Sequence, residues 1–288
     1  MANEAISLVL RPGELIALVG HNGAGKTTLL NQIVGTAKPT SGDIRYGTES
    51  LRKNSNLARR VASMMPQIHA PLTGVTPRQA ITSIGLLRGL SGRDARLEAN
   101  TLINELDIAP WQNAGGEKLS GGIRRLTSYA MAVTAPPPVL LIDEPTNDVD
   151  PARRPLIWQN LRRLADTGHI VIVVTHNLLE VQRTADRYVL LQNGKVLIDS
   201  TPRQLSQQAR TSTLSVSFRP DFDPATAPAA LRVHPIADGE LRMDLDRAQV
   251  PGAVTWVLEQ VEAGNIDTYT LAPSSLESLY EGITNVRQ

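Results

Sequence analysis

The sequence predicts an α/β fold with a parallel-sheet domain over residues 1–211 and a small α+β domain over residues 212–288. In the first part, apolar runs of strand length alternate with amphipathic segments, as in buried parallel sheets covered by helices. Between about residues 71 and 135 the strand pattern disappears and helical periodicity replaces it, which predicts a helical insertion. After about residue 211, short strands return beside two helices, which predicts the separate α+β domain.

The elements of the first domain follow from periodicity and from the residues that end each run. We expect strands at residues 15–19, 43–46, 61–65, 139–142, 170–175, 188–191 and 195–199. Asn193-Gly194 favours a tight turn, so the last two strands should form a hairpin. We expect helices at residues 27–34, 79–87, 95–106, 123–134 and 155–165, with glycine or proline ending several of them.

In the second domain we expect strands at residues 214–218, 240–246 and 267–271 and helices at residues 253–263 and 275–283. Residues 219–228 are rich in proline and aspartate and should form a loop.

Composition excludes several classes of function. Twenty-nine basic residues against 28 acidic ones give a net charge of +1, so we expect no nucleic acid partner. The chain has no cysteine, which excludes disulfides and thiolate metal sites. Glu4 and Arg11 precede any long apolar run, unlike a signal peptide, and the longest apolar runs are far too short to span a bilayer. We therefore expect a cytoplasmic chain whose membrane role would need another polypeptide.

The most specific motif is a phosphate-binding loop between the first strand and the first helix. Gly20 to Thr27 fits G-x-x-x-x-G-K-[ST] at every fixed position. Its glycines let successive backbone N–H groups face one anion, and the helix that follows adds the positive end of its dipole. The ATP-binding set is then His21, Asn22, Gly23, Ala24, Gly25, Lys26, Thr27 and Thr28.

Two carboxylates end the apolar strand at residues 139–142, where ligands of parallel sheets collect. Alone, Asp143 and Glu144 could be solvated acids after an ordinary strand. Beside a phosphate loop, Asp143 would hold Mg²⁺ together with the Thr27 hydroxyl, and Glu144 would act as general base toward the attacking water. The predicted cofactors are ATP and Mg²⁺.

A second cradle for an anion stands at the start of the helix at residues 123–134. A serine hydroxyl followed by two glycines, Ser120-Gly121-Gly122, offers a hydroxyl and exposed backbone amides. Alone it could be a plain capped loop. With the phosphate loop it suggests a site assembled from two faces.

The order of these motifs resembles the ATPase subunits of ABC (ATP-binding cassette) transporters over about residues 5–210. The phosphate loop, Gln67, Leu119–Gly122, Val139–Pro145, Asp150 and His176 follow one another in family order with family-like spacing. The resemblance implies a head-to-tail dimer with a second copy or a homologous subunit, in which one chain's signature loop closes over the nucleotide of the other. Ser120, Gly121, Gly122 and Asp150 would then act in trans.

The resemblance also assigns roles in cis to two residues that mean little alone. Gln67 would touch Mg²⁺ and the attacking water, although a loop glutamine by itself is usually without function. His176 would contact the γ-phosphate, the alternative being a histidine that merely ends a strand. The catalytic set is therefore Glu144, His176 and Gln67, and the metal set is Thr27, Gln67 and Asp143.

Three departures from the family pattern stand out. Asn147, Asp148 and Val149 differ from the usual Ser-Gly/Ala-Leu before Asp150, and Ile123 replaces the usual Gln or Met after the signature. The segment at residues 5–8 already matches the stretch just before the phosphate loop, and no aromatic residue precedes Tyr46. We expect either that this start lacks the family's first strand or that contacts other than an aromatic stack hold the adenine.

The end of the chain points to a branch of the family. Residues 273–284 resemble the closing helix of ATPases from the drug, antibiotic-peptide and sodium exporter branch. We expect an ATP-hydrolysing subunit that powers an exporter by dimer closure, at the cytoplasmic face of the inner or plasma membrane. A separately encoded multi-span permease would dock near residues 68–90. The alternative is a soluble ABC ATPase doing mechanical or regulatory work without a channel.

Overall fold

The computed structural model describes residues 2–68, 71–176, 178–208, 211–219, 228, 232–237 and 239–273. The chain divides into two compact units, Met1–Ser200 and Thr201–Gln288. Sequence analysis expects the division at residue 211, and the structure groups α8 (Pro202–Gln208) with the second unit instead.

A six-stranded sheet in the order β4-β5-β6-β1-β7-β8 forms the centre of the first unit. Its strands are β1 (Leu15–Val19), β4 (Ala62–Met65), β5 (Val139–Asp143), β6 (Ile170–Val174), β7 (Arg187–Gln192) and β8 (Lys195–Ser200). All neighbours run parallel except β8, which returns antiparallel from β7 around the Asn193-Gly194 turn. Every residue of β1, β5 and β6 is buried, as in a parallel sheet covered on both faces. The carboxyl ends of these strands therefore open on one edge.

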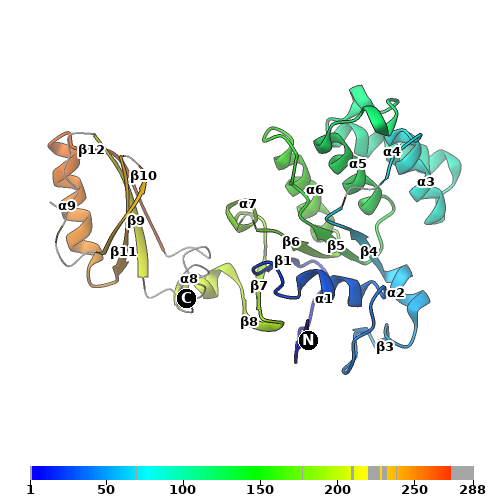
Figure 1. Ribbon diagram of the computed structural model, residues 1–288, viewed down its shortest axis with the longest axis horizontal. Helices are drawn as coiled ribbons and strands as arrows, with labels where there is room; N and C mark the ends of the chain where they lie inside the picture. Colours follow the sequence, from blue (N-terminus) through cyan, green and yellow to red (C-terminus); the bar gives the residue numbers. More distant parts are fainter. Residues whose placement is uncertain are drawn as a thin grey trace. The chain divides into compact units, whose positions relative to one another are not determined.

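Helices cover both faces of this sheet (Figure 1). On one face lie α1 (Lys26–Ile33) and α2 (Ser55–Val61), whose Leu30 and Val61 join the apolar core formed with Ile16 and Leu141. On the other lie α5 (Gly121–Val133) and α6 (Arg154–Asp166). The short helix α7 (Leu178–Gln182) follows β6, and a small two-stranded sheet pairs β2 (Arg45–Tyr46) with β3 (Glu49–Ser50).

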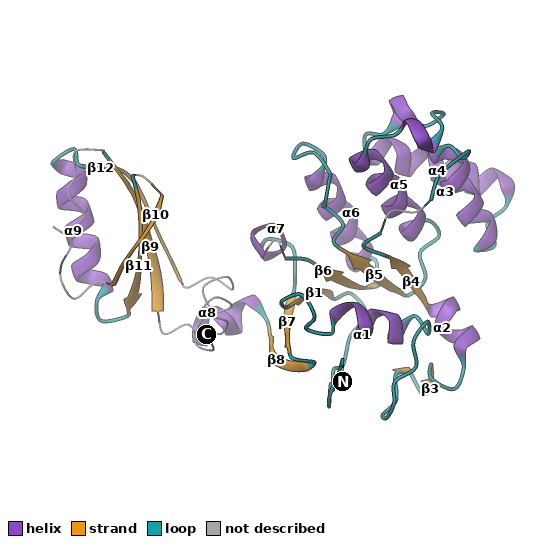
Figure 2. Ribbon diagram, in the orientation of Figure 1, coloured by secondary structure: helices purple, strands orange, loops and turns teal. Residues whose placement is uncertain are grey.

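The described residues of the expected insertion contain helices and loops and no strand (Figure 2). The helices are α3 (Pro77–Leu87), α4 (Gly92–Glu105) and α5, and two 3₁₀ turns lie between α4 and α5, at Ala109–Trp111 and Gly116–Lys118. A capping box fixes the start of α3, since the Thr76 hydroxyl accepts from Gln79 N–H and the Gln79 side chain accepts from Thr76 N–H. Ser91 caps α4 by accepting from the amide of Asp94. These local signals explain why strands give way to helices here.

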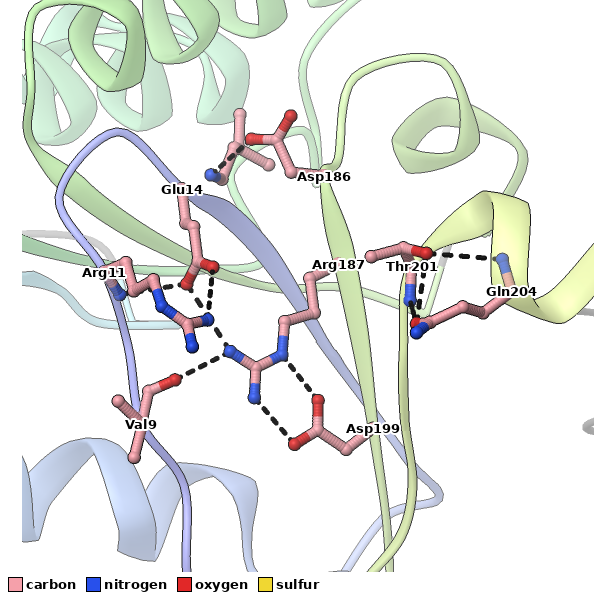
Figure 3. Close-up of polar contacts among 9 residues, drawn as sticks. Val9, Arg11, Glu14, Asp186, Arg187, Asp199, Thr201 and Gln204 are labelled. Atoms are coloured by element: carbon pink, nitrogen blue, oxygen red, sulfur yellow. Dashed lines mark hydrogen bonds and ion pairs between the residues drawn. The ribbon is translucent and has the colours of Figure 1, made fainter.

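The segment before β1 is held on the β7–β8 hairpin (Figure 3). Arg187 of β7 forms a two-point ion pair with Asp199 of β8 and donates to the carbonyl of Val9 at 2.7 Å. The Glu14 carboxylate lies 3.5 Å from the same guanidinium. Nearer the start, Glu4 N–H donates to Gly194 O at 2.8 Å, which leads the chain toward the loop after β1.

The second unit is an antiparallel sheet in the order β10-β11-β9-β12 with α9 (Val250–Glu262) packed on it. Its strands are β9 (Thr211–Phe218), β10 (Arg232–Ala237), β11 (Glu240–Asp246) and β12 (Ile266–Pro273). Alternate residues such as Leu214, Val216 and Met243 face Trp256 and form its core. The helix expected at residues 275–283 and most of the loop at 219–228 lie outside the described residues.

The main strands and helices confirm the expected elements to within a few residues. The elements that sequence analysis missed are short or carry conflicting signals: β3, α2, α7, α8 and β10. Strand β10 contains Pro235, and it lies at the edge of its sheet, where a proline is tolerated. Across the described residues, no helix is both long and apolar enough to cross a membrane.

Candidate functional site

The loop from β1 to α1 leads into a helix start that has no side-chain cap. Gly25 stands directly before α1 with φ 102° and supplies no side-chain cap, so the first N–H groups of the helix remain available to an anion. A Cβ on Gly25 would lie 2.2 Å from Asn3 Oδ1 and 2.4 Å from Ala2 O. Only glycine fits here, because both the φ angle and the close approach exclude a side chain.

Lys26 is the cation of this loop. Its Nζ donates to the carbonyls of Gly20 at 2.6 Å and His21 at 3.0 Å, so the side chain folds back along the loop. Burial lowers the pKa of Lys26, and the carboxylates of Glu144 and Asp143 act in the opposite direction. A phosphate at this point would offer the ammonium group stronger acceptors than two neutral carbonyls.

Two carboxylates stand at the carboxyl end of β5 and line the same cavity as this loop: Asp143, the last residue of the strand, is 2% exposed, and Glu144 is 7% exposed. Thr27 Oγ1 donates to Asp143 Oδ2 at 3.4 Å. Burial raises the pKa of Asp143, and the neighbouring Glu144 raises it further. The Thr27 hydroxyl and the Asp143 carboxylate therefore place side by side two oxygen ligands of the kind that Mg²⁺ prefers. Because Asp143 is buried, keeping its carboxylate ionised costs free energy.

Glu144 has one oxygen paired and one oxygen without a partner. Its Oε1 lies 2.9 Å from His176 Nδ1, which brings the expected histidine to the carboxylate. Its Oε2 is buried and has no hydrogen-bond partner among the described residues. A buried acceptor that nothing satisfies fits a group that would orient a water or take its proton.

A cavity of about 390 Å³ joins these groups. Its lining consists of Ala2, Asn22, Gly23, Ala24, Gly25, Lys26, Thr27, Thr28, Gln67, Asp143, Glu144 and Val174. Gln67 therefore lies with the phosphate loop and the carboxylates, as expected from the sequence. His21 does not line the cavity; its Nδ1 lies 2.7 Å from the carbonyl of Asn22. The amides, the hydroxyl and the buried oxygens together fit ATP with Mg²⁺.

The expected trans residues do not line this cavity. Ser120 and Gly121 are exposed, and the Ser120 hydroxyl accepts from Ile123 N–H at 3.4 Å as the cap of α5. A Cβ on Gly122 would lie 2.5 Å from Asp148 O, so the signature loop packs closely on the loop after β5. Asp150 pairs with Arg153 of its own chain at 2.6 Å and accepts from two backbone amides.

Two residues at the site, Ala2 and Arg125, were not among those expected from the sequence. Ala2 lines the cavity. Arg125, although 1% exposed, carries no motif; its signal is a helical phase shared with the buried Leu126 and Tyr129. On α6, Arg162 forms ion pairs with Asp166 and Asp186, and Arg163 forms one with Glu105.

Known proteins are similar to this chain in sequence and in fold. The family model described as ABC transporter matches residues 4–147. The Nod factor export ATP-binding protein I of Paraburkholderia xenovorans is 30% identical over 249 residues, which is 86% of this chain and 78% of the relative. A solved ATP-binding subunit of an ABC transporter superposes with a TM-score of 0.67 at 25% identity, covering 72% of this chain and 86% of that one.

A second solved structure is a dimeric post-hydrolysis state of the ATP-binding cassette MJ0796 bound to ADP and Pi. It superposes with a TM-score of 0.64 at 25% identity, covering 70% of this chain and 91% of that one. The fold, the phosphate loop with its buried carboxylates, and these similarities agree on one assignment. The chain belongs to the ABC transporter family and is an ATP-binding, ATP-hydrolysing subunit.

Proposed function

We propose that this ATPase subunit drives an exporter, and that hydrolysis requires a head-to-tail dimer. The observation that carries the dimer is the separation of the two anion cradles. The cavity joins the phosphate loop to Gln67, Asp143 and Glu144, whereas the second cradle lies outside it, with Ser120 and Gly121 exposed. A second subunit would bring its own Ser120 cradle over the open side of the phosphate site. The dimeric cassette among the similar structures supports the same arrangement.

Within one site, this chain's residues divide the work. The amides of residues 22–28 and Lys26 would hold the phosphates. Thr27, Asp143 and Gln67 would hold Mg²⁺, which supplies charge neutralisation for the phosphoryl group being transferred. Glu144 would accept a proton from the attacking water through the oxygen that has no other partner, and His176 would steady the opposite oxygen. Asp150 would shape the loop that meets the second subunit.

Export is supported by a relative whose name is Nod factor export ATP-binding protein I. We infer that the partner is a separately encoded membrane permease and that this subunit binds it at the cytoplasmic face of the membrane. Exposed apolar side chains that would suit a docking helix of the permease lie on the helical insertion and just before it. They are Ile68, Leu86, Leu87 and Leu97, and Ile68 and Leu87 are each 82% exposed. Large side chains at that exposure gain by being covered.

Co-purification from detergent-solubilised membranes tests the permease. Tagged parent protein should bring down a multi-span protein in stoichiometric amount. Leu87→Glu should lose this partner and keep its ATPase activity without the partner. Leu197→Glu, at an exposed leucine on β8, is the matched control and should retain it. A dimer that purifies without any membrane protein from the native host would favour the alternative, an ABC ATPase doing mechanical or regulatory work without a channel.

A further inference from the structure

We propose that Arg125 is a positioning residue for hydrolysis, because its guanidinium fixes the backbone that carries the catalytic carboxylates relative to the backbone of Gln67. This inference rests on the proposed role of Glu144 as the general base. Arg125 lies on α5, one turn after the signature loop, and is 1% exposed. Its partners are all backbone carbonyls from two loops that meet at the nucleotide cavity.

The hydrogen bonds of Arg125 use its whole donor set. Nε donates to Glu144 O at 3.0 Å, and Nη2 donates to the carbonyls of Asp143 and Glu144. Nη1 donates to Pro66 O at 3.0 Å and Gln67 O at 2.7 Å. A guanidinium has five N–H donors in a rigid planar fork, and all five are engaged. The plane of this one group therefore sets the spacing between the two loops.

A buried cation requires a reason. Burial lowers the pKa of Arg125, with the carboxylates of Asp143, Glu144 and Asp148 opposing that effect, but a guanidinium remains protonated in proteins. Removing a charge from water is unfavourable unless its donors are all satisfied, as they are here. An apolar side chain would fill the same space without that penalty. The function gained is a fixed geometry across five hydrogen bonds.

The conformation of Glu144 shows what this geometry holds in place. Glu144 has φ 51°, a left-handed backbone conformation that side chains disfavour. Its N–H is held by Val174 O at 2.8 Å, and its carbonyl accepts two hydrogen bonds from Arg125. Both sides of the residue are therefore fixed. Without Arg125 the carbonyl of Glu144 would keep only the 3.4 Å hydrogen bond from Asn147 N–H, so the peptide after Glu144 would be held more loosely and the carboxylate would lose its fixed aim into the cavity.

Arg88 provides the matched comparison. Arg88 is partly buried, and burial lowers the pKa of its guanidinium too. It donates to the carbonyls of Ala132 and Thr134 and to the Ser63 hydroxyl, none of which lines the cavity. A purely structural role for buried arginine predicts that the two residues behave alike. A positioning role predicts that only Arg125 affects the chemical step.

The test compares the turnover of Arg125→Lys with that of Arg88→Lys. Turnover is expressed per nucleotide-binding site, and the sites are counted by titration with a fluorescent ATP analogue, so that unfolded protein does not contribute. Lysine keeps the charge, but its three donors radiate from one atom and cannot span both loops. Arg125→Lys should lower kcat at least about tenfold with KM for ATP changed less than about threefold. Arg88→Lys should keep kcat within about twofold. If Arg125→Lys does not fold, Arg125→Gln replaces it with the same expectation.

A double-variant cycle separates positioning from general damage. If Arg125 acts through Glu144, adding Arg125→Lys to Glu144→Gln should lower the residual kcat by less than about twofold, because the base is already gone. Parental kcat in Arg125→Lys, an equal loss in Arg88→Lys, or a full additional loss in the double variant would each overturn the proposal. Parental kcat in Glu144→Gln would instead overturn the base assignment itself, so the two failures are distinguishable.

Discussion

Two loops of this chain precede a helix with glycines in the turn, yet the nucleotide cavity described above is lined by one of them and not by the other. The phosphate loop ends at Gly25, which has no side chain to cap α1, and it lies across from Asp143 and Glu144. The signature loop ends at Ser120, whose hydroxyl caps α5, and the loop lies on the surface. The same local device, amides at a helix start, is thus enclosed in one place and exposed in the other.

This difference teaches that a helix start is a site only when charges of the right kind surround it. Lys26, the Thr27 hydroxyl and two buried carboxylates converge on the first loop. The second loop packs against Asp148 of its own chain and needs groups from elsewhere. In the function we propose, the first loop binds ATP for hydrolysis, and the second completes a site formed mainly by another subunit.

The largest expected effect comes from Glu144→Gln, which removes the proposed base and leaves the phosphate loop intact. Turnover should fall by about 10²–10⁴, the usual contribution of a positioned base. ATP affinity should stay near the parental value, and an ATP-bound dimer should accumulate in size-exclusion chromatography. Turnover at the parental rate would mean that Glu144 is not the base and that the phosphate-loop cavity is not the catalytic centre we describe.

Mixing two inactive variants tests the division of work between the loops. Lys26→Met damages the phosphate loop, and Ser120→Ala damages the signature loop, so each homodimer should hydrolyse little ATP. In mixed dimers one of the two sites combines an intact phosphate loop with an intact signature loop. Random mixing should restore up to about a quarter of parental turnover, since about half of the dimers are mixed. If subunit exchange is verified and turnover still does not recover, both loops act within one chain.

The sequence predicted the phosphate-loop half of this comparison well because its chemistry is local. Gly20 to Thr27 form a contiguous motif between a strand and a helix, and Asp143 and Glu144 follow a recognisable apolar strand. Gln67 and His176 needed the family resemblance, because a single glutamine or histidine carries no pattern of its own. Their convergence depends on sheet order, which brings β4, β5, β6 and β1 together from distant parts of the chain.

The features that sequence analysis missed depend on tertiary contacts. Arg125 is a charged residue on a helix whose function appears only when its five donors meet the carbonyls of two other loops. The Arg163 pair with Glu105 joins α6 to α4 and cannot be found by scanning neighbours. Strand β10 exists because β11 pairs with it, although Pro235 argues against a strand locally.

Two glycines of the phosphate loop should differ in what they tolerate. Gly25→Ala places a Cβ against Asn3 Oδ1 and Ala2 O and disturbs the amides before α1, so ATP affinity should fall at least about tenfold. Gly23→Ala meets no atom within 4 Å and bears only the penalty of its φ of 83°. Its affinity should fall less, by a few fold, as measured by isothermal titration calorimetry. Equal losses would mean that close packing by Ala2 and Asn3 does not shape this loop.

The smallest expected effect is that of Asp143→Asn on thermal stability in the absence of nucleotide. The variant should be more stable than the parent, although it should be less active. The pKa of Asp143 is raised above its ordinary value of 3.8, first by burial and then by Glu144. Below the ordinary pKa the residue is protonated in the folded and unfolded states alike, and no penalty exists. As pH rises past 3.8 the unfolded chain ionises first, so folding stability falls until the folded-state pKa is passed, and the penalty then persists at neutral pH.

Asp143→Asn removes that penalty and should raise Tm at pH 7 by a few degrees in the absence of nucleotide, on the scale of about 2–4 °C per kcal/mol for a chain of this size. As pH falls toward the ordinary pKa of 3.8 the two proteins should melt closer together, because the parent carboxyl then takes up its proton in the folded state. The same variant should lose Mg²⁺-dependent hydrolysis, since the amide is a poorer ligand than a carboxylate. A lower Tm for Asp143→Asn at pH 7 would mean that Thr27 and Arg125 stabilise the carboxylate by more than its burial costs. The charge of Asp143 would then be compensated within the protein without a bound cation.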